Sequence, residues 1–524
     1  MHEFLPILLS LLGLLAAGTL LAPRLHLPAP VLLALLGVAF ASIPGTPEVH
    51  MHPDLILVLF LPPLLYADAF QTSWVDFRRW LRPIVMLAVG LVAATILAVG
   101  FTVHALLPGI PLAACMALGA VVSPTDVVAM QAVIERLHVP RRMTAILGGE
   151  SLVNDATGLV GVQVAVAVVM SGSFSLGGAG LEFARVAGVG VLSGLVVGGA
   201  FAWINSRVRD VRPLFALSLL SPYLAFQLAE LLSASGVLAV IFAGFVVAWR
   251  IHALPGTARF GLYASWWNLT FLLNGFCFLL IGLATPRLLA SVSENPTVLV
   301  AGLLVSAVVM GMRFLWCFPF AYLPLYLSPA LRRLEGGYPP LENVIVASWA
   351  GVRGAVSLAA ALALPQALPD GSPFPGRDEL IECAILVVLV TLFLQGGTLE
   401  PLVRWLGIRG GEDSSTEVRH ARAAAIAAGI ERLDAFCSER SCPISVFHLR
   451  THMQDELASL RDEDREKRRS AAARLEVSRE VRGAVNEAQR KRLLQLRDRG
   501  SINDRTYTEL LLDLDRASLD GLPR

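Results

Sequence analysis

The segment 148–158, with the sequence GGESLVNDATG, places two carboxylates inside an apolar run that extends from about 143 to 170. Ser151 and Asp155 are four residues apart, so on a helix they share one face, and Glu150 and Asn154 share the neighbouring face. A polar stripe that only joins helices normally uses Ser, Thr or Asn. Two carboxylates in an apolar helix therefore indicate a functional site.

The rest of the chain is suited to a lipid bilayer. Of its 524 residues, 55% are hydrophobic and 16% are charged, whereas soluble proteins carry about 25% charged residues. The apolar residues form runs of about 20 between Leu5 and about Arg404. The net charge of +1 does not indicate nucleic-acid binding, because the charges are sparse before Gly410 and dense after it. The sequence therefore predicts an all-α polytopic membrane protein.

Thirteen apolar segments are predicted to cross the membrane. They are 5–22, 29–43, 54–70, 83–107, 111–134, 143–170, 182–205, 213–232, 235–250, 263–284, 297–326, 341–365 and 379–402. One set of alternate loops is rich in arginine, whereas the other set holds only Arg287 and Arg377, with Arg185 at a span edge. By the positive-inside rule, this asymmetry places the N-terminus outside and the C-terminus in the cytoplasm.

Residues 409–524 differ in composition from the membrane domain, 1–408. The stretch from Glu456 to Arg497 is rich in Arg, Glu, Ala and Leu, which favours helix. Val477, Val481 and Val485 recur at helical spacing. We expect a cytoplasmic, mainly helical tail, with a regulatory or dimer-contacting role as the alternative to simple self-packing.

The fifth predicted span contains Ser123-Pro124-Thr125-Asp126. Pro124 has no N–H group and disfavours helix just before it. A break at this position would free carbonyl groups beside the Asp126 carboxylate. Transporters use such broken helices to coordinate cations near the bilayer midplane.

The twelfth predicted span places Arg353 between Gly351 and Gly354, so its backbone can bend. A buried arginine needs a partner, and we expect Glu150 to form a structural salt bridge with it. Arg313 also needs a partner, which the sequence does not identify. Four other carboxylates lie nearer span ends, where water lowers the cost of charge, and are expected to be structural: Asp68, Glu230, Glu342 and Glu382.

Three motifs resemble those of the monovalent cation:proton antiporter family, namely the bacterial sodium/proton exchangers of the NhaP type and their animal relatives. They are Gly149–Ala156, Thr125-Asp126 and Gly351–Ala355, and Leu61–Leu65 also matches. The resemblance covers about 5–405. It implies a homodimer of thirteen-span protomers with two inverted six-helix repeats, a dimerisation domain, an ion-carrying core and two broken helices that cross at the site.

The resemblance also assigns roles to residues of this chain. It implies that Asp155 binds either the cation or the proton and that Asn154 is its partner. Ser151, Thr125 and Asp126 would help to coordinate the ion, directly or through water. Glu150 and Arg353 would form the buried salt bridge of the core. No cofactor and no metal other than the transported cation is implied.

The predicted activity is exchange of a monovalent cation for H⁺ across the cell (inner) membrane, with Na⁺ favoured over K⁺ and Li⁺. The pair Asn154-Asp155 resembles that of electroneutral members, and the activity would control intracellular pH and cation level. A monovalent cation channel and an ion or pH sensor could use the same cluster, but a channel needs a continuous polar path and the cluster is local. No nucleophile–base arrangement or catalytic metal signature indicates an enzyme.

Overall fold

The computed structural model describes residues 4–25, 27–43, 53–126, 139–171, 176–294, 296–368, 371–408, 412–439, 444–460, 465–499, 506, 510, 511 and 514. Their regular secondary structure is helical, apart from one isolated bridge between Ala367 and Pro373. The predicted all-α class is therefore confirmed. The chain forms two compact units, 1–410 and 411–524.

The first unit is built from apolar helices, several of them interrupted. They are α1 (Phe4–Leu25), α2 (Ala29–Ala41), α3 (Pro53–Gln71), α4 (Trp74–Arg79), α5 (Leu81–Val85), η1 (Met86–Leu91), α6 (Val92–Leu106), α7 (Leu112–Val122), α9 (Arg141–Ser171), α10 (Leu176–Asn205), α11 (Val211–Leu231), α12 (Gly236–Trp249), α13 (Gly256–Glu294), α14 (Pro296–Leu327), α15 (Pro329–Leu334), α16 (Leu341–Trp349), α17 (Ala355–Leu362), α18 (Arg377–Val390), η3 (Thr391–Gly396) and α19 (Gly397–Trp405).

The lengths and composition of these helices fit a multi-pass membrane protein. Among the described residues, eight helical segments are long and apolar enough to cross a membrane, and four shorter apolar helices accompany them. The shorter helices are 29–41, 58–71, 112–122 and 236–249. The membrane class is thus confirmed, whereas the count of thirteen spans and the inverted repeats stay predictions.

Local sequence signals set several helix ends. The Ser235 hydroxyl accepts a hydrogen bond from the Leu238 N–H at 3.3 Å and caps α12. Ser73 caps α4 in the same way, by accepting from the Asp76 N–H at 3.2 Å. α2 has proline in its first turn, where the missing N–H would have no helical partner.

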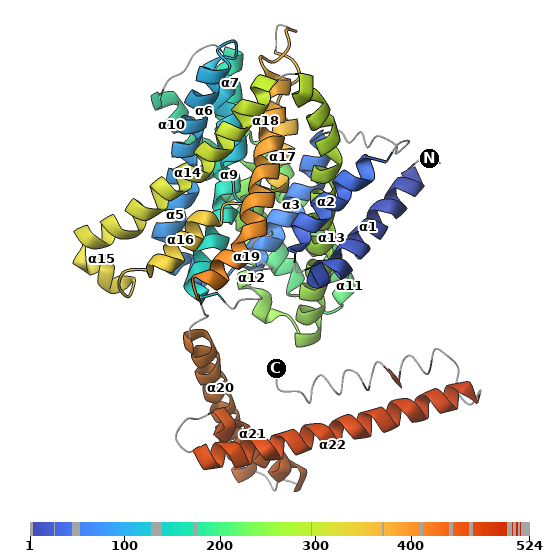
Figure 1. Cartoon of the computed structure of the whole chain (residues 1–524). Coiled ribbons are helices and arrows are strands. Elements are labelled where there is room, and N and C mark those ends of the chain that lie inside the picture. Colours follow the sequence, from blue (N-terminus) through green and yellow to red (C-terminus); the bar gives the residue numbers. More distant parts are fainter. Residues whose placement is uncertain are drawn as a thin grey trace. The chain divides into compact units, whose positions relative to one another are not determined.

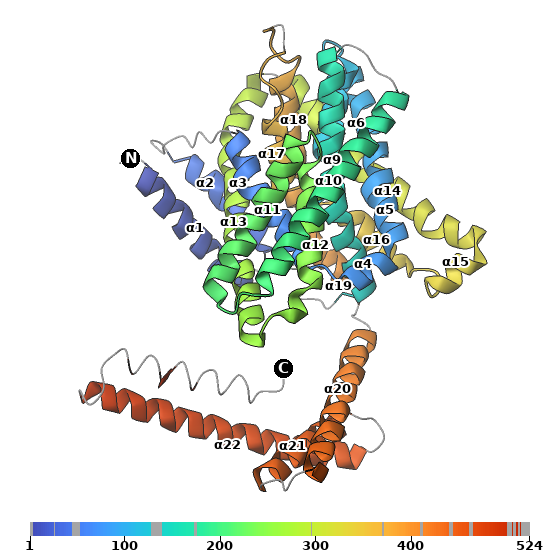
Figure 2. The ribbon, with the colours of Figure 1, turned by 180° about the vertical axis from the view of Figure 1, so that it is seen from behind.

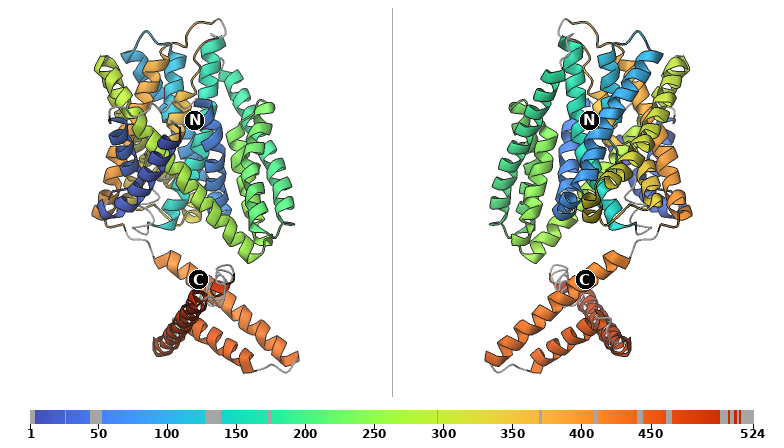
Figure 3. Two further views of the ribbon diagram at one scale, coloured as in Figure 1. Left: turned by 90° about the vertical axis from the view of Figure 1, so that its right-hand side faces the viewer. Right: turned by 90° about the vertical axis from the view of Figure 1, so that its left-hand side faces the viewer.

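The helices of the first unit pack in two groups (Figures 1 and 2). In the first helix group, α3 and α10 pack against α12, and α2 packs against α13. In the second helix group, α7 lies between α6 and α9, while α14 packs against α6, α16 and α18. Figure 3 shows α10, α11 and α12, in green, together along one side of this unit. The candidate site lies where the two groups meet.

The second unit consists of α20 (Glu412–Glu439), α21 (Ile444–Leu460) and α22 (Arg465–Asp498). Arg422 of α20 pairs with Glu456 of α21 at 2.7 Å, and Arg474 of α22 pairs with Asp455 of α21. The described part of the tail is therefore helical, as predicted. Its cytoplasmic location stays a prediction.

Candidate functional site

Two interrupted segments cross in the second helix group. α7 ends at Val122, and residues 123–126 are not helical, in keeping with the proline at 124. The remainder of the predicted fifth span, 127–134, lies outside the described residues. α16 ends at Trp349 and α17 begins at Ala355, so residues 350–354 form the second interruption.

Hydrogen bonds join the two interruptions directly. The Asp126 N–H donates to the Val352 carbonyl at 2.7 Å, and Arg353 Nε donates to the Val122 carbonyl at 3.0 Å. Another guanidinium nitrogen of Arg353 donates to the Gly351 carbonyl, just beyond the end of α16. The Arg353 cation therefore lies at the negative, C-terminal ends of both α7 and α16. Within the described residues, the end of the α7 segment therefore meets the break between α16 and α17, in agreement with the predicted crossing.

The predicted salt bridge between Glu150 and Arg353 is wrong. Both carboxylate oxygens of Glu150 accept hydrogen bonds from the Arg313 guanidinium, one of them at 2.8 Å. Arg313 Nε also donates to the Ala347 carbonyl at 2.9 Å. Arg313 thus takes the carboxylate that we assigned to Arg353. Arg353 is satisfied in another way, because the two helix ends offer carbonyl groups that have lost their helical donors.

A cavity with an empty volume of about 420 Å³, part of it open to solvent, lies between the two helix groups. Asp68 of α3, Asp155 of α9 and Asp126 of the first interruption all line this carboxylate cavity. Its other polar lining residues are Thr125, Ser151, Asn274 and Ser357. No lysine, arginine or histidine is among its described lining residues. Three carboxylates without a basic side chain favour the binding of a cation.

Asp155 is a buried carboxylate that lines the cavity. It is 7% exposed, and none of the ion pairs formed among the described residues includes it. Desolvation disfavours an ionised carboxylate that has no counter-charge. Asp155 is therefore stabilised by whatever neutralises it, a proton or a cation.

Asn154 is not among the described residues that line the cavity, but it contacts one of them. Its amide nitrogen donates to Thr125 Oγ1 at 2.8 Å, so it ties α9 to the first interruption. Its amide oxygen is buried and has no hydrogen-bond partner among the described residues. Of the five predicted ion-binding residues, the structure brings Asp155, Asp126, Ser151 and Thr125 to the cavity and leaves Asn154 as their support.

The sequence interpretation missed Asp68, which we expected to be structural. α3 ends at Gln71, only three residues later, and hydropathy alone therefore places Asp68 near the membrane surface. The structure brings it into the carboxylate cavity with Asp155 and Asp126. One sequence signal was present, because Asp68 lies one helical turn after Leu64, which belongs to the matching segment Leu61–Leu65. In the structure, Leu64 and Asp68 both line the cavity.

Gly354 is required by the position of Asp126. A Cβ atom added at Gly354 would lie 1.7 Å from Asp126 Oδ2 and 2.5 Å from its Cγ. The missing side chain is therefore what lets the Asp126 carboxylate lie against the second interruption. Gly158 has a similar role, because a Cβ there would lie 2.5 Å from Pro124 Cγ.

Comparison with known proteins agrees with this geometry. A family model described as "Sodium/hydrogen exchanger, transmembrane" matches residues 7–405. The chain is 34% identical, over 88% of each chain, to the uncharacterised Na⁺/H⁺ exchanger YjcE of Escherichia coli. It is 33% identical to the sodium, potassium, lithium and rubidium/H⁺ antiporter of Bacillus pumilus, over 75% of this chain and 60% of that one.

A solved structure has the same fold. The sodium proton antiporter MjNhaP1 of Methanocaldococcus jannaschii matches with a TM-score of 0.59 and 21% identity, over 77% of this chain and 99% of that one. The family model covers nearly all of the first unit, including both interruptions and the residues that line the carboxylate cavity. The chain belongs to the sodium/hydrogen exchanger family.

Proposed function

We propose that this protein is a secondary active antiporter that exchanges a monovalent cation for H⁺, with Asp155 binding either ion. The observation that carries the proposal is the carboxylate cavity, where Asp68, Asp126 and Asp155 meet without a basic side chain among the described lining residues. Its relatives are named as Na⁺/H⁺ exchangers and as Na⁺, K⁺, Li⁺ and Rb⁺/H⁺ antiporters. Na⁺ is the proposed substrate, with K⁺ and Li⁺ as alternatives.

Competition for one site explains the coupling. The ionised Asp155 carboxylate offers a hard oxygen ligand, and the Thr125 and Ser151 hydroxyls beside it offer two more. A proton on Asp155 removes the negative charge that holds the cation. The two ions therefore bind alternately, and no ATP is needed for exchange.

The location of the cavity supports alternating access. Its walls come from α3 and α13 of the first helix group and from α9, α17 and the two interruptions of the second. Movement of one group against the other would expose Asp155 to each side of the membrane in turn. With no ion bound, an ionised Asp155 resists this movement because its charge is uncompensated, so transfer follows neutralisation of Asp155 by either ion.

Exchange of one cation for one proton is the proposed stoichiometry. The residue beside Asp155 on α9 is an asparagine, which does not bind a second proton. Glu150, the other carboxylate on this part of α9, is held by Arg313. Transport with this stoichiometry moves no net charge.

The protein is proposed to act as a homodimer in the cell (inner) membrane, with its N-terminus outside and its tail in the cytoplasm. The arginine-rich loops support this orientation. In this setting the exchanger would control intracellular pH and cation level. Labelling of single cysteines introduced at Arg207 and Asp378 tests the proposed orientation, because the two exposed positions should react from opposite sides of the membrane.

Transport by the purified full-length chain in proteoliposomes tests the proposed function. A pH dye inside the vesicles should respond to Na⁺, K⁺, Li⁺ and Rb⁺ added one at a time, with a rate that saturates. A potential-sensitive dye should report no charge movement during turnover. Unsaturable cation flux without proton movement would indicate a channel instead, and charge movement would contradict the one-to-one exchange.

A further inference from the structure

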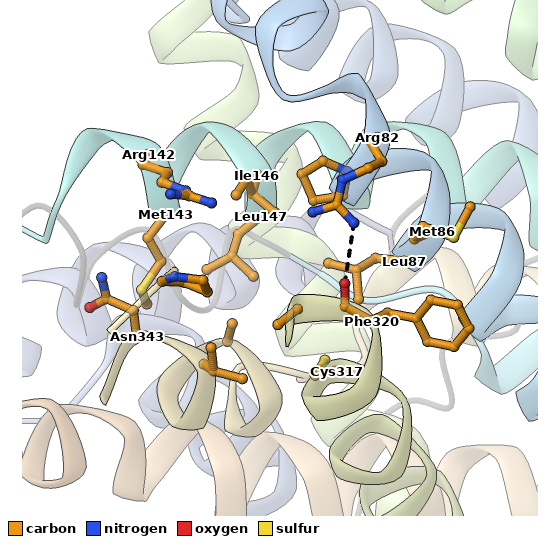
Figure 4. A pocket seen from close by; sticks show the side chains of 15 residues that line it. Arg82, Met86, Leu87, Arg142, Met143, Ile146, Leu147, Cys317, Phe320 and Asn343 are labelled. Carbon is orange, nitrogen blue, oxygen red and sulfur yellow. Dashed lines mark hydrogen bonds between the residues drawn. The ribbon is translucent and has the colours of Figure 1, made fainter. Parts of the chain in front are cut away.

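A second cavity lies within the second helix group and shares no lining residue with the carboxylate cavity. Its empty volume is about 720 Å³, part of it open to solvent, and it is lined by residues of α5, η1, α9, α14 and α16 and by Pro339. Of its fifteen lining residues, Arg82, Arg142 and Asn343 are the polar ones. Figure 4 shows the two arginines on the same side, with Leu87 and Leu147 beyond them. The cavity is therefore amphiphilic, cationic on one side and mainly apolar elsewhere.

The two arginines share one carboxylate. Arg82 Nε lies 2.5 Å from Glu335 Oε1, and one terminal nitrogen of Arg142 lies 3.2 Å from Glu335 Oε2. The two guanidinium groups and the one carboxylate form the cationic rim of the cavity, which has a net charge of +1. The side chains of Arg82 and Arg142 are 23% and 26% exposed, so a ligand in the cavity can reach them.

Both guanidinium groups have N–H donors that no acceptor among the described residues uses. Each has five N–H groups. Arg82 uses three of them, two on Glu335 and one on the Phe320 carbonyl at 3.2 Å. Arg142 uses two, both on Glu335. Among the described residues, half of the ten donors therefore have no acceptor, and guanidinium groups suit the paired oxygens of a phosphate group.

The cationic rim adjoins a surface that is suited to lipid. Glu335 directly follows Leu334, the last residue of α15, which is 79% exposed. Tyr326 and Leu327, at the end of α14, are 75% and 70% exposed. The Arg142 guanidinium lies over the Trp80 ring, 4.3 Å from its centre, which fixes its direction. Tryptophan and arginine beside exposed apolar residues are typical of the membrane–water interface.

We propose that this second cavity binds an anionic phospholipid, with its phosphate on Arg82 and Arg142 and an acyl chain along the apolar wall. One negative charge on the lipid, as in phosphatidylglycerol, matches the net charge of the rim. A free phosphate would meet the same cations but would leave the apolar wall in contact with water. Basic pockets between membrane helices bind anionic headgroups in the same way.

Binding of phosphatidylglycerol and phosphatidylcholine to the purified full-length protein, measured by native mass spectrometry, tests the proposal. The protein should bind phosphatidylglycerol about tenfold more tightly than phosphatidylcholine, as one or two charge-assisted hydrogen bonds imply. Arg142→Gln should remove this preference. Arg207→Gln is the matched control, because Arg207 also lies over a tryptophan, Trp203 at 3.5 Å, but lines neither cavity.

Glu335→Gln separates a binding role from a structural one. It raises the charge of the rim from +1 to +2 and should strengthen phosphatidylglycerol binding several-fold, whereas damage to the fold would weaken binding in this variant and in Arg142→Gln alike. Ala321→Phe, which fills the apolar part without changing charge, should weaken binding of the lipid.

Three results would overturn the proposal. The first is equal binding of the two lipids by the unmodified protein. The second is binding that neither Arg142→Gln nor Glu335→Gln alters. The third is full competition by glycerol 3-phosphate at the same concentration, which would show that the cavity recognises a small anion and not a lipid.

Discussion

Glu150 and Arg313 form an ion pair in which both side chains are 1% exposed. The pair joins α9 to α14, and Arg313 Nε extends the connection to α16 through the Ala347 carbonyl. Glu150 is therefore already neutralised, whereas Asp155, further along the same helix, faces the carboxylate cavity. Two carboxylates of one motif thus have different roles, one structural and one open to ions.

The Glu150–Arg313 pair should be essential for folding but replaceable as a unit. Glu150→Gln or Arg313→Gln alone leaves a buried charge without its partner, which costs about 3–5 kcal/mol. The double variant should recover folded yield and thermal stability, measured by fluorescence-detected size exclusion. Glu150→Gln combined with Arg353→Gln should not recover them. Rescue by the second combination and not by the first would contradict the observed pairing.

Arg353 should tolerate no replacement that loses the planar guanidinium. It binds carbonyl groups at the ends of two helices, Val122 and Gly351, and an ammonium group cannot match that geometry. We expect Arg353→Lys to lower the free energy of unfolding by about 2 kcal/mol. The exposed Arg209 supplies the control, Arg209→Lys, whose melting temperature should stay unchanged. Equal melting temperatures of the two variants would contradict the bridging role of Arg353.

Gly354→Ala should disturb the site without adding charge. The new methyl group would lie 1.7 Å from Asp126 Oδ2, so the carboxylate or the interruption must move, at a cost of about 1–3 kcal/mol. Exchange should slow at least about tenfold. Gly148→Ala on α9 is the control, because a Cβ there meets nothing within 4 Å. Wild-type exchange by Gly354→Ala would show that Asp126 need not lie where it does.

Asp68→Asn should weaken cation binding while leaving exchange measurable. It removes one of the three carboxylates that line the cavity but keeps the shape of the side chain. The half-saturating cation concentration should rise about tenfold, as the loss of one charged contact implies. The exposed Asp378 gives the control Asp378→Asn. An unchanged half-saturating concentration for Asp68→Asn would return Asp68 to a structural role.

Residue patterns predict much of this architecture. The apolar runs and Pro124 predict the helices and the first interruption because both depend on local chemistry. The pairing of Arg353 could not be predicted, because its partners are backbone carbonyls that become available only when two helix ends meet. Asp68 was missed for a related reason. Its position near the end of a predicted span does not show which residues line a cavity that forms between several helices.

The central claim is that Asp155 is the carboxylate that exchanges a proton for a cation. The most direct test is Na⁺-dependent recovery of a pH-dye signal in proteoliposomes, comparing the unmodified protein with Asp155→Asn and the control Asp378→Asn at equal amounts of folded protein. The account predicts saturable exchange by the unmodified protein and by Asp378→Asn, and none by Asp155→Asn. Exchange by Asp155→Asn at the unmodified rate would contradict it.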